Sequence, residues 1–370
     1  MIVFKTAEFY RTVQKRNLLI FGVLFLMLFV AAIIACGIGT VAIPPMDVLL
    51  AFGHAIFPGS VDTPATSNTG FIIIGYRLPR VLLAVLTGVS LAVAGAVMQG
   101  LLRNPLVSPF TLGLSSAASF GSAFMIVLGP IFFNTAFTGI AAVVGINLSL
   151  GTSLLILSAF FFGWMSVVLV YLISRTKQTS QAIMILAGVV VSYLFQACLL
   201  ALQYISDDEA LRDIITWLMG GMWGANWQVI TILLPIVLIC FFLIERRAWD
   251  LNTLSGGDDV AKNLGVNVSQ FRINGLLIVS FSTSACLAFT GVIGFIGLMA
   301  PHLCRMIVGN DYRYLLPCSA VMGALILLIS DTAARSLFSP IEIPVGVIMY
   351  ILGGFFFLYL IMRGHGGYLG

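Results

Sequence analysis

Charged residues are scarce in this chain: they make up 9% of the 370 residues, whereas hydrophobic residues make up 60%. A water-soluble domain carries about a quarter charged residues, so this composition excludes a soluble globular protein. It is typical of a polytopic membrane protein. The net charge of +4 therefore does not indicate nucleic-acid binding, because basic residues in a membrane protein first report its orientation.

Residue types that build reactive sites are also few. The sequence has three histidines, too scattered to form a metal site or a catalytic triad. None of the six cysteines belongs to a CxxC pair, and all lie within or beside apolar runs, as small buried hydrophobic residues do. The phosphate-binding pattern GxxxxGK[ST] is absent, so another polypeptide would have to bind ATP. We therefore expect no catalytic residue, no metal site and no cofactor in this chain.

Long apolar runs dominate the sequence instead. At about 20 apolar residues per membrane crossing, they predict about ten transmembrane helices, and residues 1–370 are expected to form one transmembrane domain of the all-α polytopic class. The first run is longer than the roughly 7–15 apolar residues of a signal-peptide core, which predicts a retained helix. The predicted spans are 18–39, 76–101, 110–129, 142–173, 182–204, 228–244, 272–290, 292–308, 315–337 and 344–362.

The basic residues predict the orientation of these spans. With a cytoplasmic N-terminus, fourteen Lys and Arg residues fall on the inner side and four on the outer side. The positive-inside rule predicts this asymmetry, so both termini are expected in the cytoplasm. On the outer side, a cluster of acidic residues at 207–213 followed by Trp217 predicts an amphipathic helix at the membrane interface.

A weak internal similarity suggests a repeat. The pattern LAxxG occurs at 91–95 and at 287–291, each time with a proline ten residues after the glycine, and the same 196-residue shift overlays Gly113 on Gly309. Chance is one explanation, because these residue types are common here. The other is an inverted repeat, since the shift maps the second span onto the seventh, five crossings away.

One long polar segment, residues 248–270, interrupts the second half of the chain on the predicted cytoplasmic side. Gly256 and Gly257 permit tight turns, and residues 260–264 read as a short helical piece that Gly265 closes. A short helix that projects from the membrane offers a rigid contact for another protein. The missing phosphate-binding loop explains why such a contact is needed.

Three arginines mark the predicted outer face. Arg77 and Arg80 stand at the beginning of the second span, and Arg335 ends the ninth span, one turn after Asp331. They are either interfacial anchors, with an ion pair between Asp331 and Arg335, or a positive ring that receives the acidic residues of a docking protein.

The fifth span is the most polar of the middle crossings. Ser192, Gln196 and Gln203 follow one helical stripe, with Gly188 one turn before them. Two interpretations are open: these residues hold helices together, or they line a substrate passage.

Taken together, the motifs resemble those of the permease subunits of type II ABC importers, the family that takes up iron–siderophore complexes, haem and cobalamin. They follow the family's order and cover nearly the whole chain after about residue 70, although Pro109 is followed by Phe110 and Thr111 without an acidic residue. The motifs are RLPR at 77–80; Gly95, Gln99, Asn104-Pro105-Leu106, Pro109 and Gly113; GDDxAxxLGV at 257–266; GFxGL at 294–298 with Pro301, His302 and Arg305; Asp331 with Arg335; and PxExPxG at 340–346.

This resemblance implies a permease in the cytoplasmic membrane of a prokaryote, which dimerises with a second copy or a close paralogue around a central pathway. It implies two cytoplasmic ATPase subunits that carry ATP and Mg, and an extracytoplasmic substrate-binding protein whose glutamates meet Arg77, Arg80 and Arg335. The expected substrate is an iron–siderophore complex, or else haem or cobalamin. The residues expected to couple to the ATPase, through short helices of the 248–270 loop, are Gly256, Gly257, Asp258, Asp259, Ala261, Leu264, Gly265 and Val266.

The alternative function is a secondary transporter driven by an ion gradient. Such a transporter needs carboxylates inside the membrane to carry the coupling ion, and the predicted spans offer little besides Asp331, which has Arg335 as a partner. A membrane-embedded enzyme would need a nucleophile with its base, or a metal cluster, and the sequence suggests neither.

Overall fold

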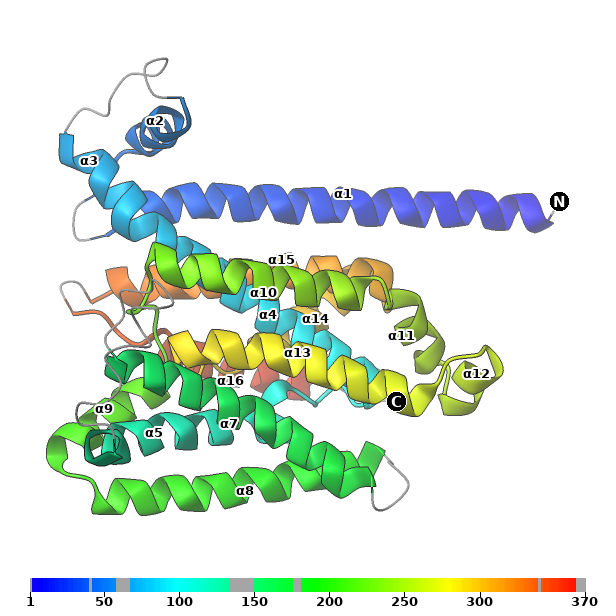
Figure 1. Cartoon of the computed structure of the whole chain (residues 1–370). Helices are drawn as coiled ribbons and strands as arrows, with labels where there is room; N and C mark the ends of the chain where they lie inside the picture. Colours follow the sequence, from blue (N-terminus) through cyan, green and yellow to red (C-terminus); the bar gives the residue numbers. More distant parts are fainter. Residues whose placement is uncertain are drawn as a thin grey trace.

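The computed structural model describes residues 2–39, 42–57, 67–132, 150–175, 181–338 and 341–363, and these form a bundle of helices (Figure 1). A π-helical turn at Ile73–Arg77 joins α3 to α4, and a 3-10 turn at Pro109–Leu112 precedes α5. The helices are α1 Ile2–Gly37, α2 Pro45–Ile56, α3 Ser67–Ile72, α4 Leu78–Leu101, α5 Leu114–Phe132, α7 Leu150–Arg175, α8 Gln181–Ile205, α9 Asp208–Met219, α10 Trp227–Glu245, α11 Ala248–Ser255, α12 Asp258–Asn263, α13 Val268–Thr290, α14 Ile296–Val308, α15 Tyr312–Ser336 and α16 Val345–Arg363.

The prediction of about ten spans is confirmed. Within the described ranges, nine helices are long and apolar enough to cross a membrane, and α14 adds a shorter apolar helix. Each predicted span overlaps one of these ten helices. The separate helix α9 matches the expected amphipathic helix between the fifth and sixth spans, and its N-terminus is capped by the carboxylate of Asp207.

The eighth span begins a few residues later than predicted. Only residues 296–308 are helical, whereas Gly291 and Phe295 both have positive φ and the backbone between them leaves the helix. Gly291 lies so close to α9 that an added Cβ would stand 2.2 Å from the carbonyl oxygen of Trp217. The break is therefore fixed by a tertiary contact, which apolar length cannot reveal.

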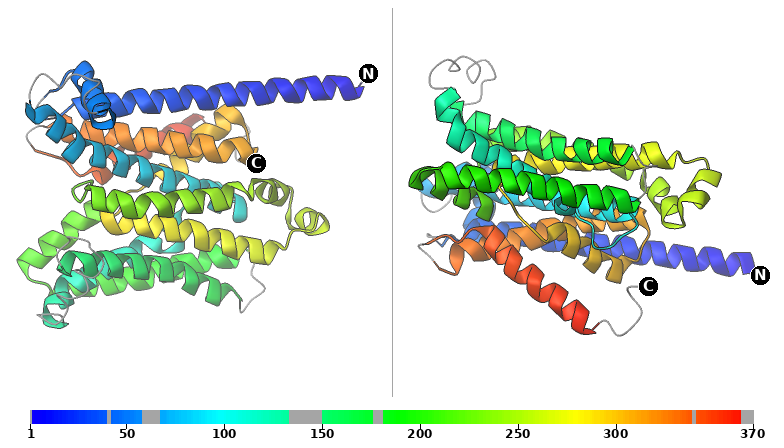
Figure 2. Two further views of the ribbon diagram at one scale, coloured as in Figure 1. Left: turned by 45° about the horizontal axis from the view of Figure 1, so that its top comes forward. Right: turned by 90° about the horizontal axis from the view of Figure 1, so that it is seen from below.

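The two faces of the bundle are distinct. The N-terminal end of α1, the end of α16 and the pair α11–α12 lie at one end, and α2, α3 and α9 lie at the other (Figures 1 and 2). This arrangement agrees with the predicted orientation, in which both termini and the 248–270 loop share the cytoplasmic side.

Two sets of helices make corresponding contacts. α4 packs on α15 as α13 packs on α7; α5 contacts α7 and α8 as α14 contacts α15 and α16. The 196-residue overlay has the wrong register, however. It places Gly95, inside α4, on Gly291, which follows α13, and it places Gly113, before α5, on Gly309, which follows α14.

The centre of the bundle depends on glycine. A Cβ on Gly95 of α4 would stand 1.8 Å from the carbonyl oxygen of Gly297 of α14, and a Cβ on Gly88 would stand 2.4 Å from that of Gly323 of α15. Small residues let helix backbones approach closely in membranes, where packing rather than the hydrophobic effect drives helix association.

We expect Gly95→Ala to destabilise the folded protein, because α14 must move to admit the methyl group. Overpacking of this kind costs about 1–3 kcal/mol. The thermal midpoint of the purified protein in detergent measures the effect. Gly354→Ala is the matched control, since nothing lies within 4 Å of a Cβ there, and equal midpoints for the two variants would contradict the assignment.

Candidate functional site

The predicted cytoplasmic loop contains two short helices, α11 and α12, which project beyond the end of the bundle (Figure 1). The predicted helical piece at 260–264 corresponds to α12, which begins two residues earlier. Of the two glycines expected to form the turn, Gly257 has φ of 119°, whereas Gly256 has an ordinary helical φ of −76°. Gly265, at φ of 88°, closes α12 as predicted.

The exposed side of this pair carries apolar side chains beside charged ones. Trp249, Val260 and Leu264 are exposed, with Leu264 at 66%. Ala261 of α12, in contrast, is fully buried on the side of the helix that faces the bundle. It sets how closely α12 packs and does not itself face a partner. Exposed apolar side chains outside the membrane-spanning helices are suited to contact with another protein.

The inward side of α12 is attached by an ion pair. Arg272 of α13 is buried and donates from Nη2 to both carboxylate oxygens of Asp258, at 3.0 and 3.1 Å, and from Nε to the carbonyl oxygen of Leu101 at 2.8 Å. Gln181, the first residue of α8, donates to Asp258 at 3.4 Å. The Asp258 carboxylate thus connects α12 with the predicted cytoplasmic ends of α4, α8 and α13.

A second attachment holds α11 to the beginning of α15. Asn252 donates to the carboxylate of Asp311 at 2.8 Å and accepts from the backbone N–H of Tyr312 at 2.8 Å. The guanidinium of Arg313 lies 4.0 Å from the ring centre of Trp249. Burial raises the pKa of Asp311, but hydrogen bonds from Arg313 and Asn252 outweigh it and leave this pKa below its ordinary value, so the carboxylate is charged at neutral pH.

The sequence did not single out Arg272, Asn252 or Asp311. Arg272 carried a usable signal, because it is a charge at the very edge of an apolar span. Asn252 and Asp311 lie 59 residues apart, and nothing local marks them as partners.

On the predicted outer face, Arg77 and Arg335 bind the end of α1. Arg77 donates to the carbonyl oxygens of Cys36 and Gly37 at 2.7 and 2.9 Å, and Arg335 donates to that of Ala35. Both arginines are buried. Cationic groups at a helix C-terminus satisfy carbonyls that have no helical partner and complement the helix dipole. Their role in docking a protein stays a prediction.

Arg80 has two acidic partners. Its Nε and Nη2 donate to Asp331 at 3.1 Å each, and its Nη1 donates to Glu342 at 2.8 Å. The predicted pair of Asp331 and Arg335 is present at 3.9 Å, so Arg80 is the nearer partner of Asp331. The sequence missed this contact because 251 residues separate the two.

The stripe on α8 divides into two parts. A Cβ on Gly188 would stand 2.6 Å from the carbonyl oxygen of Thr111, and the hydroxyl of Ser192 donates to the carbonyl of Gly188 at 2.7 Å. The first contact favours the packing interpretation for Gly188, whereas the bond of Ser192 stays within α8 and leaves its role a prediction. Gln196 and Gln203 are half-buried, and their place in a pathway stays a prediction.

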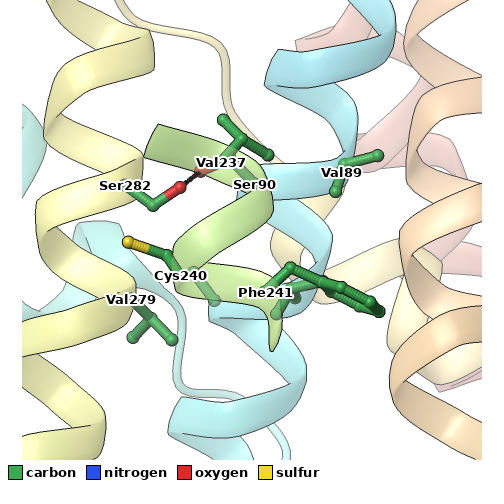
Figure 3. A pocket seen from close by; sticks show the side chains of 9 residues that line it. Val89, Ser90, Val237, Cys240, Phe241, Val279 and Ser282 are labelled. Carbon is green, nitrogen blue, oxygen red and sulfur yellow. Dashed lines mark hydrogen bonds between the residues drawn. The ribbon is translucent and has the colours of Figure 1, made fainter. Parts of the chain in front are cut away.

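A small, partly open cavity lies between α4, α10 and α13. Figure 3 shows Ser90 and Ser282 hydrogen-bonded across it, 2.8 Å apart, with Cys240 and Phe241 on its wall. Its volume of about 10 Å³ is room for one water molecule. This cavity is far too small for a metal chelate, and the described residues contain no group of three His, Cys, Asp or Glu side chains that could hold a metal ion.

Comparison with known proteins identifies similar chains. The profile of the FecCD transport family matches residues 25–363. The hemin transport system permease of Yersinia pestis is 39% identical and spans 82% of this chain and 86% of its own length. The ferric citrate import permease of Bacillus subtilis is 34% identical, covering 94% and 96%. The molybdate import permease of Haemophilus influenzae is 36% identical, also covering 94% and 96%.

A solved structure is similar as well. It shows an ABC transporter assigned to the metal-chelate type in an inward-facing conformation, and it superposes with a TM-score of 0.76 at 34% sequence identity. The match covers 93% of this chain and 99% of that chain.

Proposed function

This chain belongs to the FecCD transport family and is the permease subunit of an ABC importer, and we propose that it carries a ferric siderophore complex across the cytoplasmic membrane. Haem and cobalamin are the alternative substrates. The permease is a multi-pass membrane protein of a bacterial or archaeal complex. In this proposal two copies, or a copy and a close paralogue, form the pathway, two ATPase subunits bind ATP and Mg, and an extracytoplasmic binding protein delivers the substrate.

The observation that carries the proposal is the projecting pair α11–α12. It offers apolar side chains to the cytoplasm and is connected through Asp258 and Asn252 to α4, α8, α13 and α15. A displacement of this pair by an ATPase would therefore act on several membrane helices together. A carrier driven by an ion gradient has no need of such a projection.

Transport in proteoliposomes tests the function. The permease is reconstituted with its ATPase, the binding protein is added outside, and ATP is enclosed inside. We expect ATP-dependent accumulation of a radiolabelled ferric siderophore in preference to hemin, cobalamin and molybdate. Preferential uptake of another of these compounds would show that this compound, and not a ferric siderophore, is the substrate. Uptake without the ATPase that a protonophore abolishes would establish the gradient-driven alternative.

We expect Leu264→Asp to weaken attachment of the ATPase. Burying a leucine at an interface contributes about 1.5–3 kcal/mol, so losing it and adding a charge should lower affinity about tenfold or more. The measurement is the amount of ATPase that copurifies with the tagged permease. Glu209→Gln is the control, because Glu209 is exposed on α9, at the opposite end of the bundle from α12; normal copurification of Leu264→Asp would refute the contact.

A further inference from the structure

The guanidinium of Arg80 is shared between two carboxylates of different character. Asp331 holds the Nε and Nη2 side with a side chain that is 2% exposed, and Glu342 holds Nη1 with a side chain that is 39% exposed. The contact with Asp331 lies inside the bundle between α4 and α15. The contact with Glu342 lies at the surface of the predicted outer face, where a protein in solution can reach it.

The two contacts also differ in strength. A buried ion pair is costly to break, because it leaves an uncompensated charge away from water. An exposed pair contributes little, because water solvates both partners when they separate. Asp331 is therefore the fixed partner of Arg80, and Glu342 is the partner that can leave.

Glu342 can leave Arg80 without a change in the fold. It lies in the short connection between α15 and α16, which is held by its neighbours: the backbone N–H of Ile343 donates to the carbonyl of Ala334 at 3.1 Å, and α16 begins at Val345. The backbone on the α16 side of Glu342 is thus anchored, and release requires only rotation of its side chain.

The net charge of the cluster formed by these three arginines and two carboxylates favours binding of an acidic side chain from another protein. Arg77, Arg80 and Arg335 contribute three positive charges, and Asp331 and Glu342 contribute two negative charges, so the cluster retains one net positive charge. Release of Glu342 into water leaves one carboxylate for three guanidinium groups. A carboxylate delivered by another protein would restore the balance, as complementary charges do at protein interfaces.

We propose that Glu342 is a placeholder, which occupies the Nη1 side of Arg80 until a carboxylate of the binding protein replaces it on docking. The exchange rests on the proposed function, since it requires a binding protein that docks on this face. It makes Glu342 a competitor of the partner and so a residue that limits docking affinity. Glu342 thereby allows the complex to dissociate after substrate delivery.

The test is the affinity of the fluorescently labelled binding protein of the same transport system for the permease–ATPase complex in lipid nanodiscs. We expect Glu342→Gln to lower Kd about three- to tenfold, because an uncharged glutamine competes more weakly than glutamate with the partner's carboxylate for Arg80. Glu209→Gln is the matched control. It removes one negative charge from the exposed outer helix α9 and should change Kd much less, so a general gain of positive charge is not the cause.

Arg80→Gln and the double variant complete the experiment. Arg80→Gln should weaken docking, and adding Glu342→Gln to it should bring no further gain, because the contested site is gone. If Arg80→Gln weakens docking but Glu342→Gln leaves Kd unchanged or raises it, the exchange is refuted while docking on Arg80 stands. If Arg80→Gln has no effect although the complex is intact by size-exclusion chromatography, the docking role of Arg80 itself falls.

Discussion

Replacement of Arg272 by alanine is expected to separate ATP hydrolysis from transport. The variant leaves the apolar tip of α11–α12 in place, so the ATPase still binds. It removes the ion pair with Asp258 and the hydrogen bond to the carbonyl of Leu101, through which a movement of α12 reaches α4. Loss of a buried partner also leaves Asp258 without its counter-charge, a change that costs about 3–5 kcal/mol where both groups are fully buried and less here, because Asp258 is partly exposed.

The measurement is the ratio of substrate molecules imported to ATP molecules hydrolysed in proteoliposomes. We expect this ratio to fall about tenfold or more, since a coupling loss of 1.4 kcal/mol is already a factor of ten. Asp258→Asn, which retains the size of the side chain, should lower it less. The charge exchange Asp258→Arg with Arg272→Asp should restore only part of it, because an aspartate at position 272 can pair with the arginine but cannot donate to the carbonyl of Leu101.

Lys262→Ala is the control for this experiment. Lys262 and Asp259 form an ion pair on the same short helix, but both side chains are largely exposed, and such a pair contributes about 0–1 kcal/mol. A normal import-to-hydrolysis ratio in Arg272→Ala would exclude transmission through this contact, provided that the variant assembles with the ATPase.

The attachment of α11–α12 explains why the loop suits a coupling role. Asp258 binds Arg272 of α13 and Gln181 of α8, and Arg272 also binds the end of α4. Asn252 connects α11 to α15. A push on the pair would therefore act on four helices together, as alternating access requires.

The sequence predicted the helices well because apolar length is a local property. A run of about 20 apolar residues must cross the bilayer as a helix, whatever surrounds it. The eighth span starts a few residues later than predicted, at Ile296, although the helix is interrupted at Gly291, close to the predicted boundary. The length of this break depends on the contact of Gly291 with Trp217, a neighbour 74 positions away, which hydropathy does not report.

The candidate sites were predicted in part for the same reason. Polarity located the 248–270 loop, and charge located the outer arginines. The partners of those charges were not predictable, because a guanidinium at a span end can bind a carboxylate, a backbone carbonyl or water. The structure gives Arg80 two carboxylates and gives Arg77 two carbonyls, although the two arginines stand three residues apart.

Replacement of Arg77 by glutamine is expected to loosen α1 from the bundle. The two hydrogen bonds to Cys36 and Gly37 come from a charged donor, and hydrogen bonds to charged groups contribute about 1.5–3 kcal/mol each. Water at the outer interface can replace part of this loss, so we expect a destabilisation of about 2–4 kcal/mol. The thermal midpoint of the purified complex should fall.

Arg212→Gln is the matched control, since it removes the same charge from the exposed surface of the outer helix α9 and should leave the midpoint unchanged. Equal midpoints for Arg77→Gln and Arg212→Gln would show that α1 does not depend on this contact.

The same variants separate two ways in which an arginine can affect docking. If Arg77 acts only through α1, Arg77→Gln lowers the thermal midpoint and binding-protein capture together, and conditions that restabilise the complex restore capture. If Arg77 binds the partner's carboxylate directly, capture stays low after restabilisation. Arg77 is buried against α1, whereas Arg80 shares its guanidinium with an exposed carboxylate. We therefore expect restabilisation of the complex to restore binding-protein capture for Arg77→Gln but not for Arg80→Gln.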